Sequence, residues 1–438
     1  MDVFDKFTLE KIGQVKKTPL TGIADLGRRL PESADSFSSV EMEDRKLIIE
    51  KLSSLIAAFS EELTALVTAE TGKPIEYSRM EVTDSLNTLR RLASGLTEHQ
   101  EDGLFSSNGS FLRNPGLSGS LLYRAGYAHP ALDFIMAAGI GLSTGMAVVF
   151  VPDRLAPLSP WMILGKLIGE LPEGLVNIVI AEGTAFNKVM ESANFGTYGF
   201  SGKPSDLNGF VKRIGIRNYF SSLQENYPVI IWDEENIDSI IEEVTKSSYY
   251  AGNCYYDRAW KVIVKKEIFE YARNRIAEIS GNINVGDPRD PMNSMGPVTD
   301  SNELLAASIF SGKVKSGLGE VVMDGKVEGN VMRPTFVVPG ERIDLENPNI
   351  GVPFTMLAEA DSIDGAIEQA NYVTPGSGCA LYVNDIDIVK NAVCRLNYSS
   401  VYINTLPRRN TVMSMVPRIS FGLPGNPLEL KPQKRLII

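Results

Sequence analysis

The stretch LLYRAGYAHPALDFIMAAGIGLSTGMAVVFV, residues 121–151, decides the fold class of this chain. It begins with a strand-like run at 121–123, continues with a helix-like run at 131–144 and ends with a strand-like run at 147–151. The alternation continues with a helix at 157–169, a strand at 176–180, a helix at 184–192 and a strand at 198–200. This order predicts a parallel sheet with crossover helices, an architecture that often holds a nucleotide at the carboxyl ends of its strands.

Composition limits the class of protein. A chain of 438 residues is too long for one ordinary core, so two or three domains are expected. The net charge of −11 argues against nucleic acid as a partner. No apolar run is long enough to cross a bilayer, and residues 1–6 do not resemble a signal peptide, so we expect no membrane partner and a cytoplasmic location.

The cysteine and histidine counts narrow the chemistry. The chain has three cysteines, Cys254, Cys379 and Cys394. This number is small and odd, which argues against a disulfide framework. The only histidines are His99 and His129, which excludes a site with three histidine ligands, and we predict no metal.

The second half of the chain repeats the alternation of strands and helices around a cysteine. Ile237, Ile240 and Val244 lie on one face of a helix, 262–264 forms a strand, and Cys254 falls in the loop between them. Such a thiol is either a nucleophile whose thiolate Arg258 favours or a small buried core residue. Further strands are expected at 335–338, 354–357, 380–383 and 401–403, with helices at 266–280, 362–371 and 386–396.

Several stretches of the sequence resemble the aldehyde dehydrogenase superfamily, and they follow the same order as in that family across roughly residues 40 to 425. These stretches are ETGKP at 70–74, PDRLAPLS at 152–159, LPEGLVNIV at 171–179, VGDP at 285–288, MGPV at 295–298, AIEQAN at 366–371 and VYIN at 401–404. The resemblance implies two α/β domains with parallel-rich sheets and a small β oligomerisation arm. It assigns residues 1–220 with 406–422 to an NAD(P)-binding, Rossmann-like domain and 221–405 to a catalytic domain. It assigns 108–125 and 430–438 to oligomerisation strands, as expected for a homodimer or homotetramer.

The resemblance also implies a thiolate nucleophile, an oxyanion hole and a carboxylate that activates water. Cys254 is the candidate nucleophile. However, Lys261 resembles the family's basic residue at the start of the following strand, and counting back from it without a gap reaches Tyr256 instead. Ser222 occupies the position of the family's glutamate, and Glu225 is a weak candidate for the base. Residues 126–130 lack the family's oxyanion asparagine, for which His129 or a backbone N–H could substitute.

For the cofactor, NAD or NADP, the resemblance assigns contacts to Pro152 and to Phe200, Ser201, Gly202 and Lys203. The family's ribose-binding lysine is replaced by Val151, and the segment 348–353 lacks the family's glutamate and phenylalanine.

Three functions remain open from the sequence. The first is NAD(P)-dependent oxidation of an aldehyde to an acid through a Cys254 thiohemiacetal. The second is a pseudoenzyme, an inactive family member that serves as a binding or structural subunit. The third is an acyl-thioester (acyl-CoA) reductase acting on an acyl substrate, for which a serine at position 222 is tolerable because no water needs activation.

Overall fold

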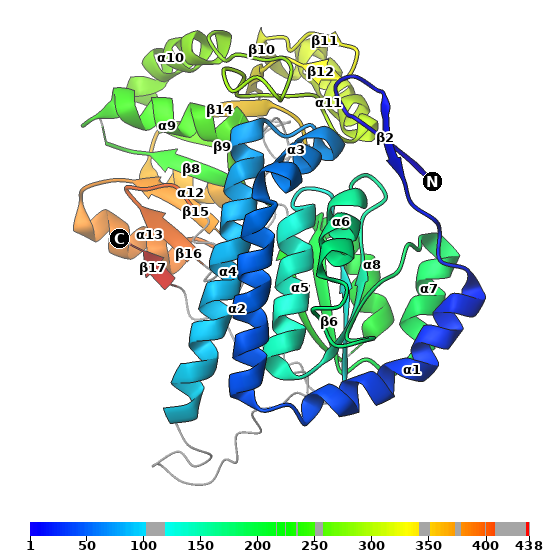
Figure 1. The fold of residues 1–438 in the computed structure, drawn as a ribbon. Coiled ribbons are helices and arrows are strands. Elements are labelled where there is room, and N and C mark those ends of the chain that lie inside the picture. Colours follow the sequence, from blue (N-terminus) through cyan, green and yellow to red (C-terminus); the bar gives the residue numbers. More distant parts are fainter. Residues whose placement is uncertain are drawn as a thin grey trace. The chain divides into compact units, whose positions relative to one another are not determined.

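The computed structural model describes residues 1–101, 119–215, 217–223, 225–233, 235–249, 257–340, 351–372, 378–398, 400–407 and 435–437. These residues form two compact units. Unit 1 contains Met1–Thr71 and Ile75–Leu223. Unit 2 contains Gly72–Pro74, the described residues between 225 and 407, and the last strand. Figure 1 shows the elements of both units.

Unit 1 is built on a five-stranded parallel sheet in the order β5-β4-β3-β6-β7. Its strands are buried on both faces. In the register of the sheet, Leu122 of β3 pairs with Val149 of β4 and with Tyr198 of β6. Near-continuous apolar strands are typical of parallel sheets covered by helices. The strands are β3 (Ser120–Arg124), β4 (Ala147–Val151), β5 (Val176–Ile178), β6 (Thr197–Gly202) and β7 (Asn218–Leu223).

Helices cover both faces of this sheet. On one face Phe134 of α5 packs edge-on against Phe150 of β4, with ring centroids 5.2 Å apart. On the other face Phe210 of α8 packs against Phe200 of β6 at 5.3 Å. The crossover helices are α5 (Pro130–Thr144), α6 (Leu158–Leu167), α7 (Gly183–Ser192) and α8 (Pro204–Ile214).

The N-terminal part of unit 1 adds a small hairpin and four helices. The helices α3 and α4 are separated at Gly72, whose φ of +77° suits glycine and ends α3. Helices α2, α4 and α5 pack against one another (Figure 1). The elements are β1 (Asp2–Phe4), β2 (Lys11–Gln14), α1 (Leu20–Ser38), α2 (Met42–Ala58), α3 (Ser60–Thr71) and α4 (Ile75–Glu101).

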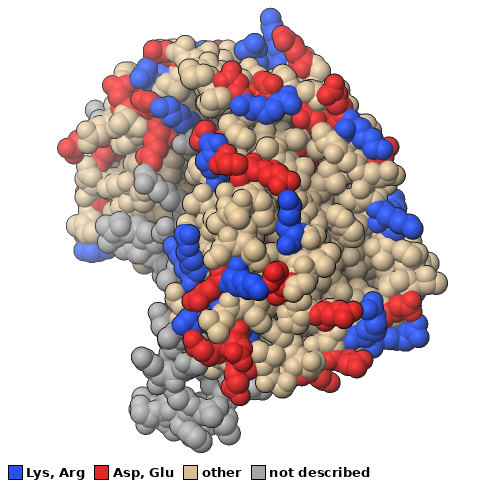
Figure 2. Space-filling view, in the orientation of Figure 1, with Lys and Arg blue, Asp and Glu red and all other residues tan. Residues whose placement is uncertain are grey.

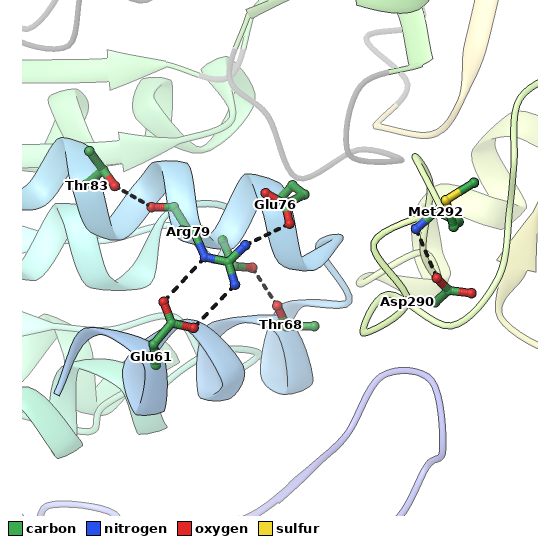
Figure 3. A network of polar contacts seen from close by, with 8 residues as sticks. Glu61, Thr68, Glu76, Arg79, Thr83, Asp290 and Met292 are labelled. Atoms are coloured by element: carbon green, nitrogen blue, oxygen red, sulfur yellow. Dashed lines mark hydrogen bonds and ion pairs between the residues drawn. The ribbon is translucent and has the colours of Figure 1, made fainter.

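Polar contacts on the surface also join α3 and α4. Arg79 donates to both carboxylate oxygens of Glu61 across the two helices and to Glu76 one turn away (Figure 3). Exposed ion pairs of this kind add little stability, because both partners remain solvated. Lys, Arg, Asp and Glu are interspersed over the described part of the face that Figure 2 shows.

Unit 2 contains an eight-stranded sheet in the order β10-β13-β14-β9-β8-β15-β16-β17. Only β10 runs antiparallel to its neighbour within this sheet. The strands are β8 (Glu225–Ile231), β9 (Asp257–Lys265), β10 (Gly319–Met323), β13 (Thr335–Pro339), β14 (Phe354–Ala360), β15 (Gly378–Tyr382), β16 (Ser400–Ile403) and β17 (Arg435–Ile437); β11 (Val327–Glu328) and β12 (Val331–Met332) form a separate hairpin.

The helices of unit 2 are α9 (Ile237–Tyr249), α10 (Phe269–Gly281), α11 (Ser301–Lys313), α12 (Ile363–Asn371) and α13 (Ile386–Arg395), with a short 3₁₀ turn at Lys266–Ile268 and a π-helical segment at Val314–Leu318. The segment between α10 and α11 is a loop, in which Asp290 accepts a hydrogen bond from the N–H of Met292 (Figure 3). The predicted fold class, α/β with parallel-rich sheets, is confirmed.

One expectation about oligomerisation strands needs correction, and the other stays a prediction. Ser120–Arg124 is not an arm strand, because β3 pairs with β4 on one side and β6 on the other, in the middle of the unit 1 sheet. Residues 108–118 lie outside the described part of the chain. In the tail, β17 pairs in parallel with β16 of the same chain, a partner that the sequence did not reveal.

Candidate functional site

The carboxyl edge of the unit 1 sheet is a topological switch point. From β3 the chain crosses to β4 and β5 on one side, and it then returns to β6 and β7 on the other side of β3. The loops after β3 and β6 therefore leave the sheet next to each other. In open α/β sheets, ligands bind in the crevice outside the strand ends at such a point.

The two loops at the switch point are tied together by hydrogen bonds. The N–H of Gly126, after β3, donates to the hydroxyl of Ser201 in β6 at 2.9 Å. A Cβ at Gly126 would lie 3.0 Å from the Cα of Gly202, so only glycine fits there without a shift of the backbone. Gly202 has a φ of +136°, which also suits glycine.

The buried carboxylate of Asp133 also binds this part of the site. Ser201 donates to Asp133 of α5 at 2.5 Å, and the hydroxyl of Tyr123 donates to the other oxygen of Asp133 at 3.3 Å. Asp133 is fully buried, and its hydrogen bonds offset the cost of removing a carboxylate from water. The sequence analysis missed Asp133, although an isolated carboxylate in an otherwise apolar helix indicates a polar partner in the core.

The residues predicted to bind the cofactor come together at this edge. Pro152 directly follows β4, Phe200, Ser201 and Gly202 end β6, and Lys203 occupies the N-cap position of α8. Phe200 and Ser201 are each 1% exposed. Since the Ser201 hydroxyl is bound to Gly126 and Asp133, this residue shapes the loop rather than presenting its hydroxyl to a ligand. The roles of these residues in cofactor binding stay predictions.

The start of α5 differs from the predicted oxyanion hole. Glu81 of α4 accepts hydrogen bonds from the N–H groups of Ala131 at 2.9 Å and Leu132 at 3.2 Å. The buried His129 places Nδ1 3.6 Å from the same carboxylate. A carboxylate thus caps the helix, as helix N-termini favour. The N–H groups of Ala131 and Leu132 are already used, and His129 faces Glu81.

A second carboxylate, Glu70, caps α6 in the same way. It accepts from the N–H groups of Leu158 and Ser159, both at 2.8 Å, and it is completely buried. Burial raises its pKa to about 7, although the hydrogen bonds from residues 158 and 159 oppose the shift. Glu70 therefore fixes the loop between β4 and α6, which follows Pro152.

In unit 2, the loop that carries Cys254 joins α9, which ends at Tyr249, to β9, which begins at Asp257. This position between a helix and a strand was predicted. Cys254 and Tyr256 themselves lie outside the described residues, so the prediction that one of them occupies the nucleophile position remains a prediction.

The strand after this loop contains one extra residue. Ala259 pairs with Tyr227 and Lys261 with Pro228, so Trp260 has no partner in β8 and forms a β-bulge. In the sequence, Cys254 lies two residues before Tyr256, the position that is reached by counting back from Lys261. The placement of Cys254 in a shifted loop stays a prediction.

Two basic side chains near the start of β9 are buried in unit 2. Arg258 is 1% exposed, and it donates to the side-chain oxygen of Asn226 at 3.0 Å and to the carbonyl of Val352 at 2.5 Å. Lys261 donates to the carbonyl of Gln369 at 3.2 Å. Of the other cysteines, Cys379 is buried, which raises the pKa of its thiol, and Cys394 is exposed.

Ser222, at the position of the family's glutamate, and the candidate base Glu225 belong to different sheets. Ser222 lies in β7 of unit 1, where it pairs with Ser201. Glu225 begins β8 of unit 2, where its backbone pairs with Asp257. The short distance in sequence therefore does not give Glu225 the structural position of Ser222.

The described residues also bear on metal binding and on membrane insertion. No group of three or more His, Cys, Asp or Glu side chains is arranged to hold a metal ion there. No single described helix is long and apolar enough to span a membrane, although the bent pair α2 and α3 passes by length and composition alone.

The fold is that of an α/β protein with a switch point at the carboxyl edge of its parallel sheet, and sequence comparison identifies its family. The profile of the aldehyde dehydrogenase family matches residues 1–417, so the chain belongs to that family of aldehyde oxidoreductases. A betaine aldehyde dehydrogenase of Cereibacter sphaeroides is 24% identical over 384 residues, 84% of this chain and 78% of that protein. A lactaldehyde dehydrogenase of Methanococcus maripaludis is 21% identical over 415 residues, 93% of this chain and 89% of that protein.

Solved structures show the same fold. An aldehyde dehydrogenase 21 from Physcomitrella patens, in complex with succinate, superposes with a TM-score of 0.82 at 19% identity, covering 96% of this chain and 88% of that chain. An NADP-dependent glyceraldehyde-3-phosphate dehydrogenase from Bacillus halodurans, complexed with NADP, gives a TM-score of 0.85 at 17% identity, covering 93% of this chain and 88% of that chain.

Proposed function

We propose that the chain oxidises an aldehyde with a nicotinamide dinucleotide as hydride acceptor, through covalent attack by Cys254. The observation that carries the proposal is the carboxyl edge of the unit 1 sheet, where the loops after β3 and β6 meet at a switch point. Membership of the aldehyde dehydrogenase family supports the aldehyde as substrate.

The residues at this edge fit a dinucleotide. Gly126 and Gly202 bring two backbone segments into close contact, and Lys203 precedes the N-terminus of α8, which favours anions. Bound there, the nicotinamide cofactor would supply the acceptor for one hydride.

In the proposed reaction, the sulfur of Cys254 bonds to the carbonyl carbon of the aldehyde, and the oxygen takes up a proton to give a thiohemiacetal. The same carbon then loses a hydride, and the hydroxyl loses its proton, so that a thioester to Cys254 remains. Attack of water on the thioester carbon breaks the C–S bond, releases the acid and returns the thiolate.

A second candidate function is transfer of the acyl group to a thiol. Ser222 in β7 cannot act as a base at neutral pH, and Glu225 belongs to the sheet of unit 2. Attack by the thiolate of a cosubstrate such as coenzyme A does not need a carboxylate to activate water. Run in reverse with reduced cofactor, this reaction is that of an acyl-CoA reductase.

The test measures formation of NADH or NADPH by the purified chain with a panel of aldehydes that includes betaine aldehyde and lactaldehyde, each with and without coenzyme A. We expect turnover that is abolished in Cys254→Ala and retained in Cys394→Ser, a control at an exposed cysteine on α13. Turnover that requires coenzyme A selects the second candidate. Equal rates for wild type and Cys254→Ala would remove Cys254 from the mechanism.

Two further outcomes concern the pseudoenzyme and the assembly. Tight cofactor binding without turnover of any aldehyde or acyl-CoA would identify a non-catalytic binding subunit. We also propose a homodimer or homotetramer, because β17 is the last strand of the unit 2 sheet and a strand there presents unpaired backbone groups. A monomer in light scattering would contradict this.

A further inference from the structure

An arginine, Arg124, lies at the switch point. The family resemblance assigns no role to this residue. Arg124 is the last residue of β3, and its Cα pairs with Val151 of β4 on one side and Phe200 of β6 on the other. Partners in a parallel ladder point to the same face of the sheet. Phe200 packs against α8 on this face, so Arg124 reaches the α7 and α8 side of the carboxyl edge.

Aromatic rings fix the guanidinium of Arg124. Its Cζ lies 5.2 Å from the centroid of Phe186 in α7 and 6.0 Å from that of Phe200. Cation–π contacts of this kind orient the guanidinium but leave its N–H groups available, because they use the face of the ring. No carboxylate of a described residue forms an ion pair with Arg124, and no acceptor among the described residues takes a hydrogen bond from it.

The cation lies one strand away from the position where the family resemblance implies a lysine. Val151 occupies that position and is 2% exposed. Neighbouring strands are about 4.8 Å apart, so the long side chain of Arg124 starts close to where the lysine would start, on the same face. The positive charge is thus present at the edge, although it comes from β3 instead of β4.

The loop after β4 adds a second positive charge. Arg154 is exposed and has no ion pair with a described carboxylate. The carboxylate of Asp153 instead accepts a hydrogen bond from the N–H of Leu155 at 2.8 Å. In doubly wound dinucleotide sites, an acidic residue after the second strand binds the ribose hydroxyls of NAD, whereas an arginine nearby accommodates the 2′-phosphate of NADP.

We propose that Arg124, assisted by Arg154, binds the 2′-phosphate on the adenosine ribose, so that the chain takes NADP in preference to NAD. This rests on the proposed function, because it assumes a dinucleotide at the switch point. A guanidinium presents paired N–H donors that match phosphate oxygens. A charge-assisted hydrogen bond of this type corresponds to roughly 10- to 100-fold in affinity.

The test is calorimetric titration of the full chain with NADP, NAD, adenosine 2′,5′-bisphosphate and 5′-AMP. We expect NADP to bind more tightly than NAD, and the bisphosphate more tightly than AMP, with a preference that shrinks as salt is added. Arg124→Gln should weaken NADP and the bisphosphate by about 10- to 100-fold and leave NAD and AMP nearly unchanged. Arg124→Lys should recover part of the loss, because it keeps the charge.

The chain provides a matched control for loss of a cation–π contact. Arg217 lies over the ring of Tyr198 at 5.8 Å and donates to its hydroxyl, at the amino edge of the same sheet. Arg217→Gln should leave all four affinities unchanged. If Arg124→Gln does not fold, as judged by circular dichroism, Arg124→Lys and the salt dependence of the wild type still test the proposal.

The outcomes separate this inference from the proposed function. Binding of NAD as tightly as NADP, or an equal loss of both in Arg124→Gln, overturns the inference and leaves the function standing. Binding of neither dinucleotide overturns both.

Discussion

The buried carboxylate of Glu70 predicts how stability depends on pH. Glu70 bridges the end of α3 to the first N–H groups of α6 and has no exposure to solvent. In the folded protein its pKa is raised from 4.5 to about 7, mainly by burial. Between these values the folded state keeps a proton that the unfolded chain releases.

The sign and the size of the effect follow from proton linkage. Because the unfolded state binds fewer protons in this range, the free energy of unfolding falls as the pH rises from 4.5 to about 7, and the contribution is constant above that. At about 1.4 kcal/mol per pKa unit, the total loss is about 3 kcal/mol.

The assay is urea unfolding of wild type and Glu70→Gln at a series of pH values from 4.5 to 8. Glutamine keeps an acceptor for one backbone N–H but cannot ionise, so the difference in unfolding free energy between the two proteins should change by about 3 kcal/mol across this range. Glu61→Gln is the control, because Glu61 is an exposed carboxylate on the same helix and faces Arg79 (Figure 3).

Parallel pH curves for wild type and Glu70→Gln would refute the argument. A wild-type stability that rises relative to the variant over this range would show that the two N–H donors outweigh burial. The pKa of Glu70 would then lie below 4.5.

Two further predictions concern the packing and the buried hydrogen bonds of unit 1. In Gly27→Ala the new methyl group on α1 would overlap the carbonyl oxygen of Ser192 at the end of α7, so we expect a loss of about 1–3 kcal/mol in urea unfolding. Gly95→Ala in α4 is the matched control, since no atom lies within 4 Å, and it should be neutral or stabilising; equal effects would contradict the clash. Asp133→Ala removes the acceptor of the Tyr123 and Ser201 hydroxyls and should cost about 2–4 kcal/mol, whereas Asp133→Asn should cost less. A neutral alanine variant would show that these hydroxyls do not need the carboxylate.

The periodicity of the sequence predicted strands β3 to β6 and crossover helices α5 to α7 of unit 1, because buried parallel strands and their helices carry uninterrupted apolar runs. It also predicted that the Cys254 loop joins a helix to a strand. Helix α8 was missed although Leu207, Phe210, Val211 and Ile214 follow the apolar spacing of a helix.

The candidate site was harder to predict, because its contacts join residues distant in sequence. Asp133 and Ser201 are 68 residues apart, and the capping of α5 by Glu81 spans 50 residues. The sequence pattern indicated no function for Arg124, because this residue is a single charge at the end of an apolar strand. Its surroundings became visible only once the sheet placed Val151, Phe186 and Phe200 beside it.

The bulge at Trp260 has a consequence for how strand β9 responds to a change in its length. Ala259, Val262 and Val264 all join one hydrophobic cluster, while Ile263 joins the cluster on the opposite face. The interval of three residues between Ala259 and Val262 breaks the usual alternation of a strand. Deleting Trp260 would restore a regular strand and keep Ala259 on the same face as Val262, whereas replacing its side chain would leave the bulge in place. A change of length, rather than a substitution, is therefore what would remove the irregularity from this strand.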